Sequence, residues 1–164
     1  MDLTRRRFFS VGAGVIVATS AAMTACVRSA TASPGDFEVT HTDAEWRQLL
    51  SADQYYVLRQ AGTEMPYSSP LNDEHSHGVF SCAGCGQDLF ASDTKFDSGT
   101  GWPSFWQPLD GAVLERADEG IGMSRTEVVC RRCGGHLGHV FDDGPPPTDL
   151  RYCMNGDAMT FRSA

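Results

Sequence analysis

The chain has 164 residues, which is room for one ordinary domain and hardly for two, and 41% of them are hydrophobic, which is enough for a core. Its 17 Gly and 8 Pro indicate many turns and favour a mainly β protein over a helical bundle. The formal net charge of -8, with Arg5, Arg6 and Arg7 among only 13 basic residues, argues against nucleic acid as a partner, because an acidic surface repels phosphate.

Residues 1–25 have the layout of an export signal. A basic cluster at Arg5–Arg7 is followed by a weakly apolar stretch, Phe8–Ala25, that ends in small residues. The paired arginines resemble a twin-arginine signal, whose pathway carries folded proteins. The alternative is a permanent membrane anchor helix, but the Gly, Ser and Thr content makes the stretch weakly hydrophobic for a stable span. We therefore expect an exported protein, in the periplasm or the cell envelope.

Cys26 follows small residues in a sequence, Met-Thr-Ala-Cys, that resembles a lipoprotein cleavage box. This favours Cys26 as the lipidated first residue of the mature chain, and the alternative is simple cleavage nearby with Cys26 lost or idle. Residues 26–40 are predicted to be a flexible tether, since Ser29–Asp36 is rich in Ser, Ala, Thr, Pro and Gly. We expect contact with a membrane only through the signal or this lipid anchor.

Two short helices are predicted to open the folded part. Thr42, with Glu45 three residues later, is a capping signal for a helix that continues to Leu50. A second helix is predicted over Asp53–Gln60, with Gly62 ending it.

From Gly78 onward the sequence has the texture of short antiparallel strands. Apolar runs at 79–80, 112–114 and 127–129 alternate with Gly, Asp and Ser, which is typical of strands joined by turns. Residues 41–164 are therefore predicted to form a single, mainly β domain.

Two cysteine pairs share the pattern C-x-x-C-G: Cys82 with Cys85, and Cys130 with Cys133. Two intervening residues let a tight turn point both sulfurs at one ion, and the following Gly permits positive φ. Four thiolates complete a tetrahedral shell and leave no open position, so we expect one structural Zn²⁺. Disulfides in an exported protein, a single redox dithiol and bound iron are the alternatives.

Cys153 is the cysteine that remains after Cys26 and the four candidate ligands. A lone cysteine is often an inert buried residue. Here Arg151 can favour the thiolate, and His136 and His139 can manage a proton. Because four thiolates already fill a metal shell, both histidines are free for other work, and Cys153 is a candidate nucleophile.

A run of aromatic residues at Gly99–Trp106 is bracketed by Gly and Pro. Its rings are either ordinary core or the walls of a small apolar pocket on a rigid loop.

Together these residues resemble the methionine-R-sulfoxide reductases of the B type, from about Trp46 to Phe161. Each motif alone is a modest signal, but their occurrence in this order is highly specific. The motifs are GTEMPYSSPL at 62–71, the two C-x-x-C-G pairs, DSGTGWPSF at 97–105, RTEV at 125–128, HLGHVFDDGP at 136–145 and RYCMN at 151–155.

The resemblance implies a fold of two antiparallel sheets, tent-like and stapled by zinc at one end, with short helices outside. It also implies a peptide-methionine (R)-S-oxide reductase that repairs oxidised exported proteins. In that reaction the Cys153 thiolate attacks the sulfoxide sulfur of peptide-bound or free methionine and becomes a sulfenic acid. His139, assisted by His136, protonates the oxygen, and Asn155 positions the substrate.

The resemblance further implies a substrate pocket with Trp102 and Phe105 as the walls that receive the methyl group. Arg151 is a substrate-binding candidate as well as a neighbour of the nucleophile. Substrate chirality would follow from such a pocket, since the methyl, oxygen and lone pair of sulfur occupy different environments.

Thr100 departs from the family pattern, because many members carry a second cysteine there that resolves the sulfenic acid as a disulfide. We therefore predict a one-cysteine cycle, regenerated by a thioredoxin-like protein or a small thiol. Separately, we expect the protein to be a monomer. The rival hypothesis is that Cys26 survives unmodified and resolves Cys153.

Two other classes of function are alternatives to this interpretation. A zinc-knuckle binding module without catalysis predicts that Cys153 is dispensable and leaves both histidines without a use. A general disulfide oxidoreductase with a C-x-x-C redox pair predicts no bound metal.

Overall fold

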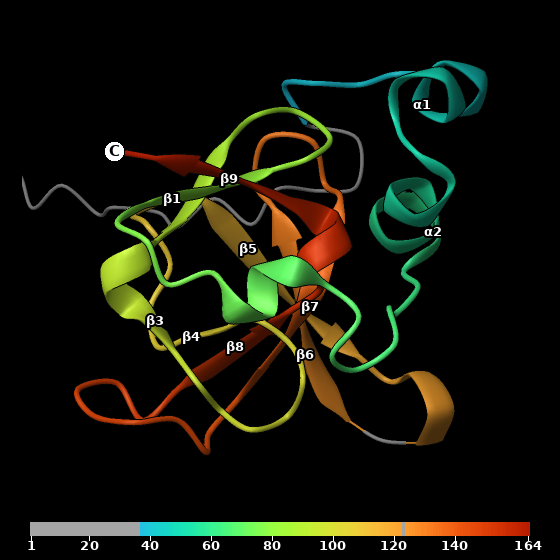
Figure 1. The fold of residues 1–164 in the computed structure, drawn as a ribbon. Helices are drawn as coiled ribbons and strands as arrows, with labels where there is room; N and C mark the ends of the chain where they lie inside the picture. The colour runs from blue at the N-terminus through green and yellow to red at the C-terminus, as the bar shows by residue number, and fades with distance from the viewer. Residues whose placement is uncertain (1–36, 123) are drawn as a thin grey trace, which may run out of the picture. The chain divides into compact units, whose positions relative to one another are not determined.

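The structure, a computed structural model, describes residues 37–122 and 124–164 and shows two antiparallel sheets with two short helices beside them (Figure 1). The mainly β fold predicted from the sequence is confirmed. The predicted export signal of residues 1–25 and the lipidation site at Cys26 lie outside the described residues. Within the described part of the chain, no helix is long and apolar enough to cross a membrane.

Helix α1 (Asp43–Leu49) begins where the capping signal predicts. The Thr42 hydroxyl accepts a hydrogen bond from the Glu45 amide at 3.3 Å, and the Thr42 amide donates to the Glu45 carboxylate at 2.8 Å. These two reciprocal bonds satisfy amides that would otherwise lack partners in the first turn. The helix buries Trp46 against the body of the domain.

Helix α2 (Ala52–Gln60) is capped in the same way by Ser51. It ends differently from the prediction, because Ala61 and not Gly62 takes the left-handed conformation, with φ 52°. Gly62 still has a steric role: a Cβ there would lie 2.3 Å from the Tyr56 ring. Gly62 is therefore required by its close packing on Tyr56 and not by a left-handed backbone conformation.

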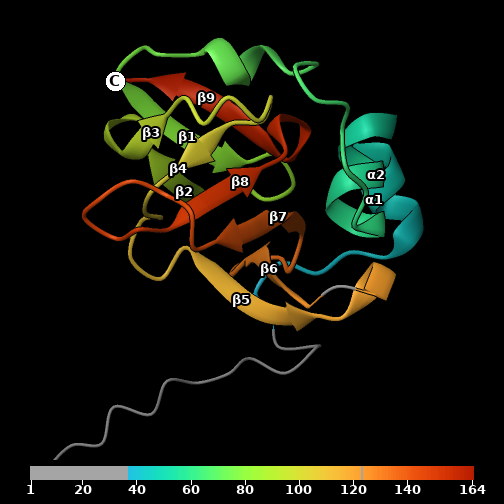
Figure 2. The same ribbon diagram turned by 90° about the horizontal axis from the view of Figure 1, so that it is seen from below.

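The smaller sheet has the strand order β2-β1-β9. Its strands are β1 (Gly78–Cys82), β2 (Asp88–Ala91) and β9 (Met159–Ser163). The larger sheet has the order β3-β4-β8-β7-β6-β5, visible in succession in Figure 2. Its strands are β3 (Lys95–Phe96), β4 (Ser104–Phe105), β5 (Val113–Asp118), β6 (Arg125–Cys130), β7 (His136–Phe141) and β8 (Arg151–Met154). Four 3₁₀ turns connect these elements: η1 (Pro70–Asp73), η2 (Ser92–Thr94), η3 (Gly120–Gly122) and η4 (Gly156–Ala158).

Aromatic rings from both sheets form the centre of the core. Phe90 and Phe105 stack with their centroids 4.3 Å apart, and Phe80 meets Phe105 edge-on at 5.0 Å. All three are fully buried, and each contributes roughly 1.5–3 kcal/mol through removal of apolar surface from water. Met154 and Met159 are buried in the same core, whereas Met65 is 74% exposed.

Residues 37–40 correct the predicted extent of the tether. The Val39 amide donates to the Arg132 carbonyl at 3.0 Å, and Glu38 forms an ion pair with the Arg132 guanidinium at 2.9 Å. Residues 37–40 therefore belong to the folded domain, and the predicted tether across 26–40 is too long at its C-terminal end.

Candidate functional site

Four cysteine sulfurs meet where the two sheets approach each other. Cys82 ends β1 and Cys130 ends β6, and the next cysteine of each pair follows in the turn. Both turns have the same hydrogen bonds: the glycine after the second cysteine donates its amide to the first cysteine's carbonyl at 2.8 Å. Gly86 and Gly134 have φ of 70° and 69°, a region that disfavours residues with a Cβ. The repeated C-x-x-C-G pattern thus gives two matching local structures.

The geometry of these four sulfurs fits a tetrahedral metal site. All lie within 4.8 Å of one another, with 3.7 Å between Cys82 and Cys133 and 3.5 Å between Cys85 and Cys130. A tetrahedron with metal–sulfur bonds of about 2.3 Å has edges of about 3.8 Å, whereas a disulfide bond is about 2.05 Å long. The four cysteines are free thiols, so the disulfide alternative does not describe this structure. They could hold a metal ion that joins one sheet to the other.

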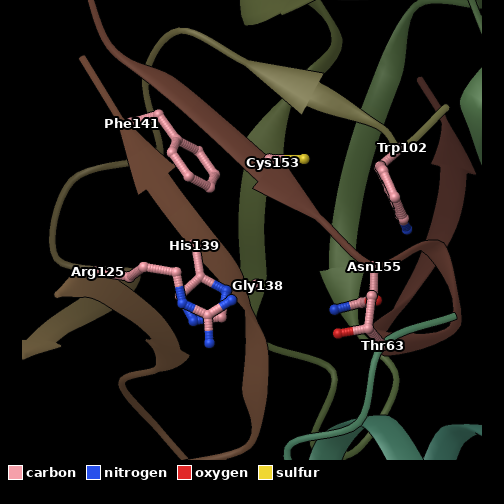
Figure 3. A pocket seen from close by; sticks show the side chains of 8 residues that line it. All are labelled: Thr63, Trp102, Arg125, Gly138, His139, Phe141, Cys153 and Asn155. Carbon is pink, nitrogen blue, oxygen red and sulfur yellow. The ribbon is translucent and has the colours of Figure 1, made fainter. Parts of the chain in front are cut away.

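A second sulfur site surrounds Cys153. A cavity of about 170 Å³ opens beside it, and Figure 3 shows Cys153, His139 and Trp102 around this space. The lining residues are Thr63, Trp102, Arg125, Gly138, His139, Phe141, Cys153 and Asn155.

Strand register brings the reactive side chains together. Cys153 on β8 pairs with His139 on β7 and with Ser104 on β4. Residues directly opposite one another in antiparallel strands share a face, with Cβ atoms roughly 4.5–5.5 Å apart. Gly138 allows the close approach of β7 to β8, since a Cβ there would lie 2.1 Å from the Cys153 carbonyl oxygen.

The surroundings of Cys153 act on its thiol in opposite directions. Burial raises the pKa of Cys153 above its ordinary value of 9.0, while hydrogen bonding to Thr100 and the charge of Arg151 oppose that rise. The Arg151 guanidinium is fixed by two bonds to Asp143, at 2.7 and 2.8 Å, and lies 4.4 Å from the centre of the Phe141 ring. Arg151 is thus a fixed positive charge near the sulfur, although it does not line the cavity.

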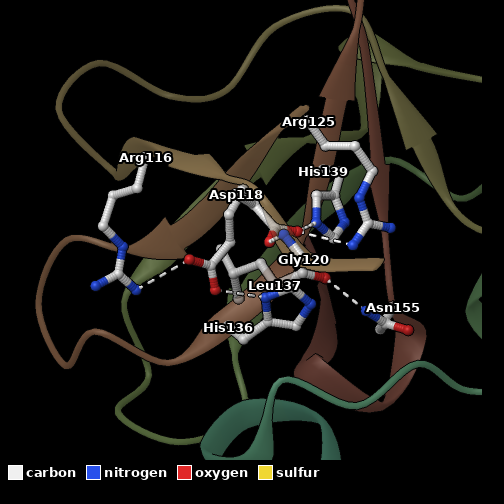
Figure 4. Close-up of polar contacts among 9 residues, drawn as sticks. Arg116, Asp118, Gly120, Arg125, His136, Leu137, His139 and Asn155 are labelled. Carbon is white, nitrogen blue, oxygen red and sulfur yellow. Dashed lines mark hydrogen bonds and ion pairs between the residues drawn. The ribbon is translucent and has the colours of Figure 1, made fainter. Parts of the chain in front are cut away.

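His139 lies on the cavity wall and has a carboxylate partner behind it (Figure 4). Its Nε2 is 2.8 Å from an Asp118 oxygen that also accepts a 2.7 Å bond from Arg125. Burial lowers the pKa of His139 below 6.5 and the Asp118 bond partly reverses this, while the same bond lowers the pKa of Asp118 to about 2. Since Asp118 holds Nε2, Nδ1 is the nitrogen left for proton exchange.

His136 is placed elsewhere. It is 4% exposed, its Nδ1 is 2.8 Å from the Glu127 carboxylate, and it does not line the cavity. Its ring centroid is 5.4 Å from that of His139. His136 is therefore a neighbour of His139 and not a second group on the cavity, and its predicted assistance to the proton transfer stays a prediction.

Asn155 and Trp102 are held by one buried residue, Glu64. The Asn155 side chain accepts from the Glu64 amide at 3.0 Å and donates to the Leu137 carbonyl at 3.0 Å. The Trp102 ring nitrogen donates to the Glu64 carbonyl at 3.2 Å. Both hydrogen-bonding groups of the Asn155 amide are thereby engaged by the backbone, which fixes its orientation at the cavity.

Phe105 corrects the predicted pair of pocket walls. It is fully buried, stacks on Phe90 and does not line the cavity, because β4 directs it into the core. Phe141 supplies the second aromatic ring of the cavity beside Trp102. Strand alternation within Ser104-Phe105 explains the division: Ser104 pairs with Cys153, and the next residue points to the opposite face.

Sequence reasoning missed Asp118, Glu127 and Glu64 as partners of the site. Glu127 lies in the quoted RTEV motif and Glu64 in GTEMPYSSPL, so a carboxylate in each motif was an available signal. Asp118 lies in no quoted motif, and only the β5–β6 pairing, which sets it opposite Arg125, brings it to His139.

Comparison with known proteins places this chain among reductases of oxidised methionine. The family model described as "SelR domain" matches residues 50–163. The chain is 54% identical over 125 residues to the peptide methionine sulfoxide reductase MsrB of Agrobacterium fabrum, covering 76% of this chain and 93% of that protein. The protein of that name from Leptospira interrogans is 51% identical over 128 residues, covering 77% and 98%. The one from Methanosarcina barkeri is 52% identical over 126 residues, covering 76% and 89%.

Proposed function

The chain belongs to the SelR domain family, and from this premise we propose that it reduces methionine-R-sulfoxide to methionine with Cys153 as the nucleophile. The observation that carries the assignment of Cys153 is its pairing with His139 on adjacent strands at the wall of one cavity. The non-catalytic binding module predicted as an alternative is not favoured by relatives that are named as enzymes.

Cys153 and His139 together hold one exchangeable proton near neutral pH. Burial raises the pKa of the thiol and lowers that of the imidazole, so the resting pair is a thiol and a neutral ring. We assign His139 the acceptance of the thiol proton as the sulfur attacks, followed by its delivery to the sulfoxide oxygen. Asp118 stabilises the imidazolium that exists between these two transfers.

The attack transfers an oxygen atom between two sulfurs. The Cys153 sulfur bonds to the sulfoxide sulfur, the protonated oxygen moves to Cys153, and methionine leaves. Methionine sulfur is reduced by two electrons and Cys153 is oxidised to a sulfenic acid. One external thiol then displaces water to form a mixed disulfide, and a second releases the Cys153 thiol. Either a thioredoxin-like protein or a small thiol can supply these two equivalents.

The cavity walls support selection of one sulfoxide epimer. Trp102 and Phe141 offer apolar surfaces for the methyl group, whereas His139 and Asn155 offer polar groups for the oxygen. Exchange of methyl and oxygen in the S epimer would place the oxygen against a ring without a hydrogen-bond partner. The walls thus favour one epimer over the other, and from the family to which the chain belongs we propose that this epimer is R.

Zinc is the metal that we propose for the four-cysteine cluster. Four thiolates are a donor set preferred by Zn²⁺, and a complete shell leaves no position for substrate. The ligands come from the β1–β2 and β6–β7 turns, so the ion would fasten the two sheets together. Its role would be structural, at a place separate from Cys153.

We also propose that the protein works outside the cytoplasm, where it repairs exported proteins damaged by oxidants. What supports this is the sequence of residues 1–25, with its basic cluster and apolar stretch, and the box that ends at Cys26. The test is to look for a lipid-modified N-terminal peptide in the membrane fraction. We expect to find it for the wild type and not for Cys26→Ser. Unmodified full-length protein in the cytoplasm would contradict it.

The reaction is tested with the separated R and S epimers of a methionine sulfoxide peptide and a small dithiol as reductant. We expect the zinc-loaded chain to reduce only the R epimer and Cys153→Ser to reduce neither. Reduction of neither epimer by a folded, metal-loaded wild-type chain would refute the proposed function.

A further inference from the structure

Three hydroxyl groups follow one another in space from Cys153, each in contact with the next, and the reaction proposed above uses none of them. The Cys153 sulfur is 3.9 Å from the Thr100 hydroxyl, which is 2.8 Å from the Ser98 hydroxyl. Ser98 is in turn 2.7 Å from the hydroxyl of Ser104. These contacts form a continuous row of hydroxyls, called here the hydroxyl chain, that leads from the reacting sulfur into the protein.

The far end of this chain is anchored in the protein interior. Ser104 is fully buried and donates to the backbone carbonyl of Trp102 at 3.1 Å. Ser104 also pairs with Cys153 across β4 and β8, so strand register fixes both ends of the chain relative to each other. A buried hydroxyl with such partners has few alternatives to the bonds that it makes.

The direction of these hydrogen bonds can follow the protonation of Cys153. When the sulfur is a thiol, it donates to Thr100, which donates to Ser98, which donates to Ser104. When the thiol proton has left, Thr100 donates to the thiolate and Ser98 donates to Thr100. Ser104 donates to Ser98 or to the Trp102 carbonyl. Only O–H rotations are needed, because every hydroxyl both donates and accepts.

We propose that this hydroxyl chain stabilises the Cys153 thiolate by reversing its direction when the sulfur becomes charged. Thr100 contacts the reacting sulfur, and Ser98 and Ser104 are positioning residues that act through Thr100. For its use in catalysis the inference rests on the proposed function, since a stabilised thiolate lowers the barrier to attack on the sulfoxide. A donor to an ionised acceptor forms a stronger hydrogen bond than a donor to a neutral one.

The charged groups around Cys153 leave a use for a neutral donor. The Arg151 charge is offset by Asp143, which it binds through two hydrogen bonds. On the other side, His139 lies in front of Asp118 and Arg125, which bind each other. The Thr100 hydroxyl lies 3.9 Å from the sulfur and adds no charge of its own to the buried site.

The test is the pH dependence of Cys153 alkylation by iodoacetamide in the zinc-loaded full-length chain, read by mass spectrometry of the peptide that carries Cys153. Thr100→Val removes the hydroxyl at nearly constant volume, and we expect it to raise the pKa of Cys153 by about one unit. The alkylation rate below that pKa then falls about tenfold. Ser98→Ala should shift the pKa in the same direction by less, and Thr100→Ser should restore the wild-type value.

Thr63→Val is the matched control, because Thr63 lines the same cavity but is not part of the hydroxyl chain. Its alkylation pKa should equal that of the wild type. An unchanged pKa in folded Thr100→Val, or an equal shift in Thr63→Val, would overturn the proposal. If Thr100→Val does not fold, an unchanged pKa in Ser98→Ala overturns it instead. Alkylation needs no sulfoxide. The expected shift in the pKa of Cys153 would therefore support the role of the hydroxyl chain even if the wild type reduced neither epimer.

Discussion

The molecule has two sulfur sites that are built in opposite ways. At the metal cluster each half is a local turn, and the same C-x-x-C-G sequence produces the same bonds and the same positive φ twice. Around Cys153 the reactive groups come from separate strands. His139, Cys153 and Ser104 lie on three strands and meet only because β7, β8 and β4 pair in one register.

This difference shows what each site depends on. The cluster needs two turns and an ion that holds them together, so it should tolerate change elsewhere in the domain and respond sharply to loss of a ligand. The reactive site depends on the register of the larger sheet, so its activity should not depend on the chemistry of the cluster as long as the fold persists. A change of a single proton-carrying side chain should instead lower its activity strongly.

The largest effect is expected from a break at the cluster. Cys130→Ser replaces a fully buried ligand and should lose the metal and at least about 3 kcal/mol of unfolding free energy, roughly 10 °C or more in Tm. Metal content and thermal unfolding check this. Cys153→Ser is the control, with metal and Tm retained and activity lost. Two variants with the same loss of Tm would show that the sites are not separate.

The next effect separates the two histidines. His139→Gln should lower kcat/KM by about 10²–10³, because His139 lines the cavity and is the residue to which we assign the transferred proton. His136→Gln should lower Tm more than kcat/KM, since this ring is buried against Glu127 and away from the cavity. Steady-state kinetics and thermal unfolding of both variants decide the matter, and the reverse order would exchange their roles.

A third prediction concerns pH. The acid limb of kcat/KM should lie below pH 6.5, because burial lowers the pKa of His139 and only the neutral ring accepts the thiol proton. The alkaline limb should lie above pH 9, because burial raises the pKa of Cys153, and loss of its proton leaves none for the oxygen. In Asp118→Asn the acid limb should move to still lower pH, since the carboxylate favours the imidazolium. A profile that rises through pH 9 would exclude this proton path.

The smallest effect on rate is expected from Thr100→Cys, which should instead change the oxidised form of Cys153 that accumulates. The Thr100 hydroxyl lies 3.9 Å from the Cys153 sulfur, so a sulfur at that place could reach Cys153. One turnover without reductant should give a disulfide between positions 100 and 153, whereas the wild type should give a sulfenic acid that dimedone traps. Thr160→Cys, on the exposed part of β9, should behave as the wild type does.

The fold class, the two helices and the meeting of the four cysteines that could hold a metal could all be predicted from the sequence. Capping residues, alternation of apolar residues and C-x-x-C-G spacing are short-range signals, and each acts within one turn or one strand. The helix end at Ala61 could not be predicted from glycine's backbone preference, because a residue with a Cβ takes the left-handed conformation there and Gly62 serves to leave room for the Tyr56 ring.

The interior of the reactive site could be predicted only in part. Cys153 and His139 stood out by their chemistry, but the register that sets Asp118 behind His139 depends on the β5–β6 pairing. Phe105 and Trp102 share one motif, and which of them reaches the cavity is decided by the direction of a two-residue strand. Sequence spacing alone holds neither kind of information.

The burial of methionines gives the enzyme a form of self-protection. Met154, the next residue after the nucleophile, has no exposed surface, and Met159 is 4% exposed. Oxidation would turn either into a polar sulfoxide within the core, so shielding keeps the repair machinery intact under the conditions that create its substrate. Met65 is instead 74% exposed, and any lesion there lies on the surface, within reach of a second copy of the same enzyme.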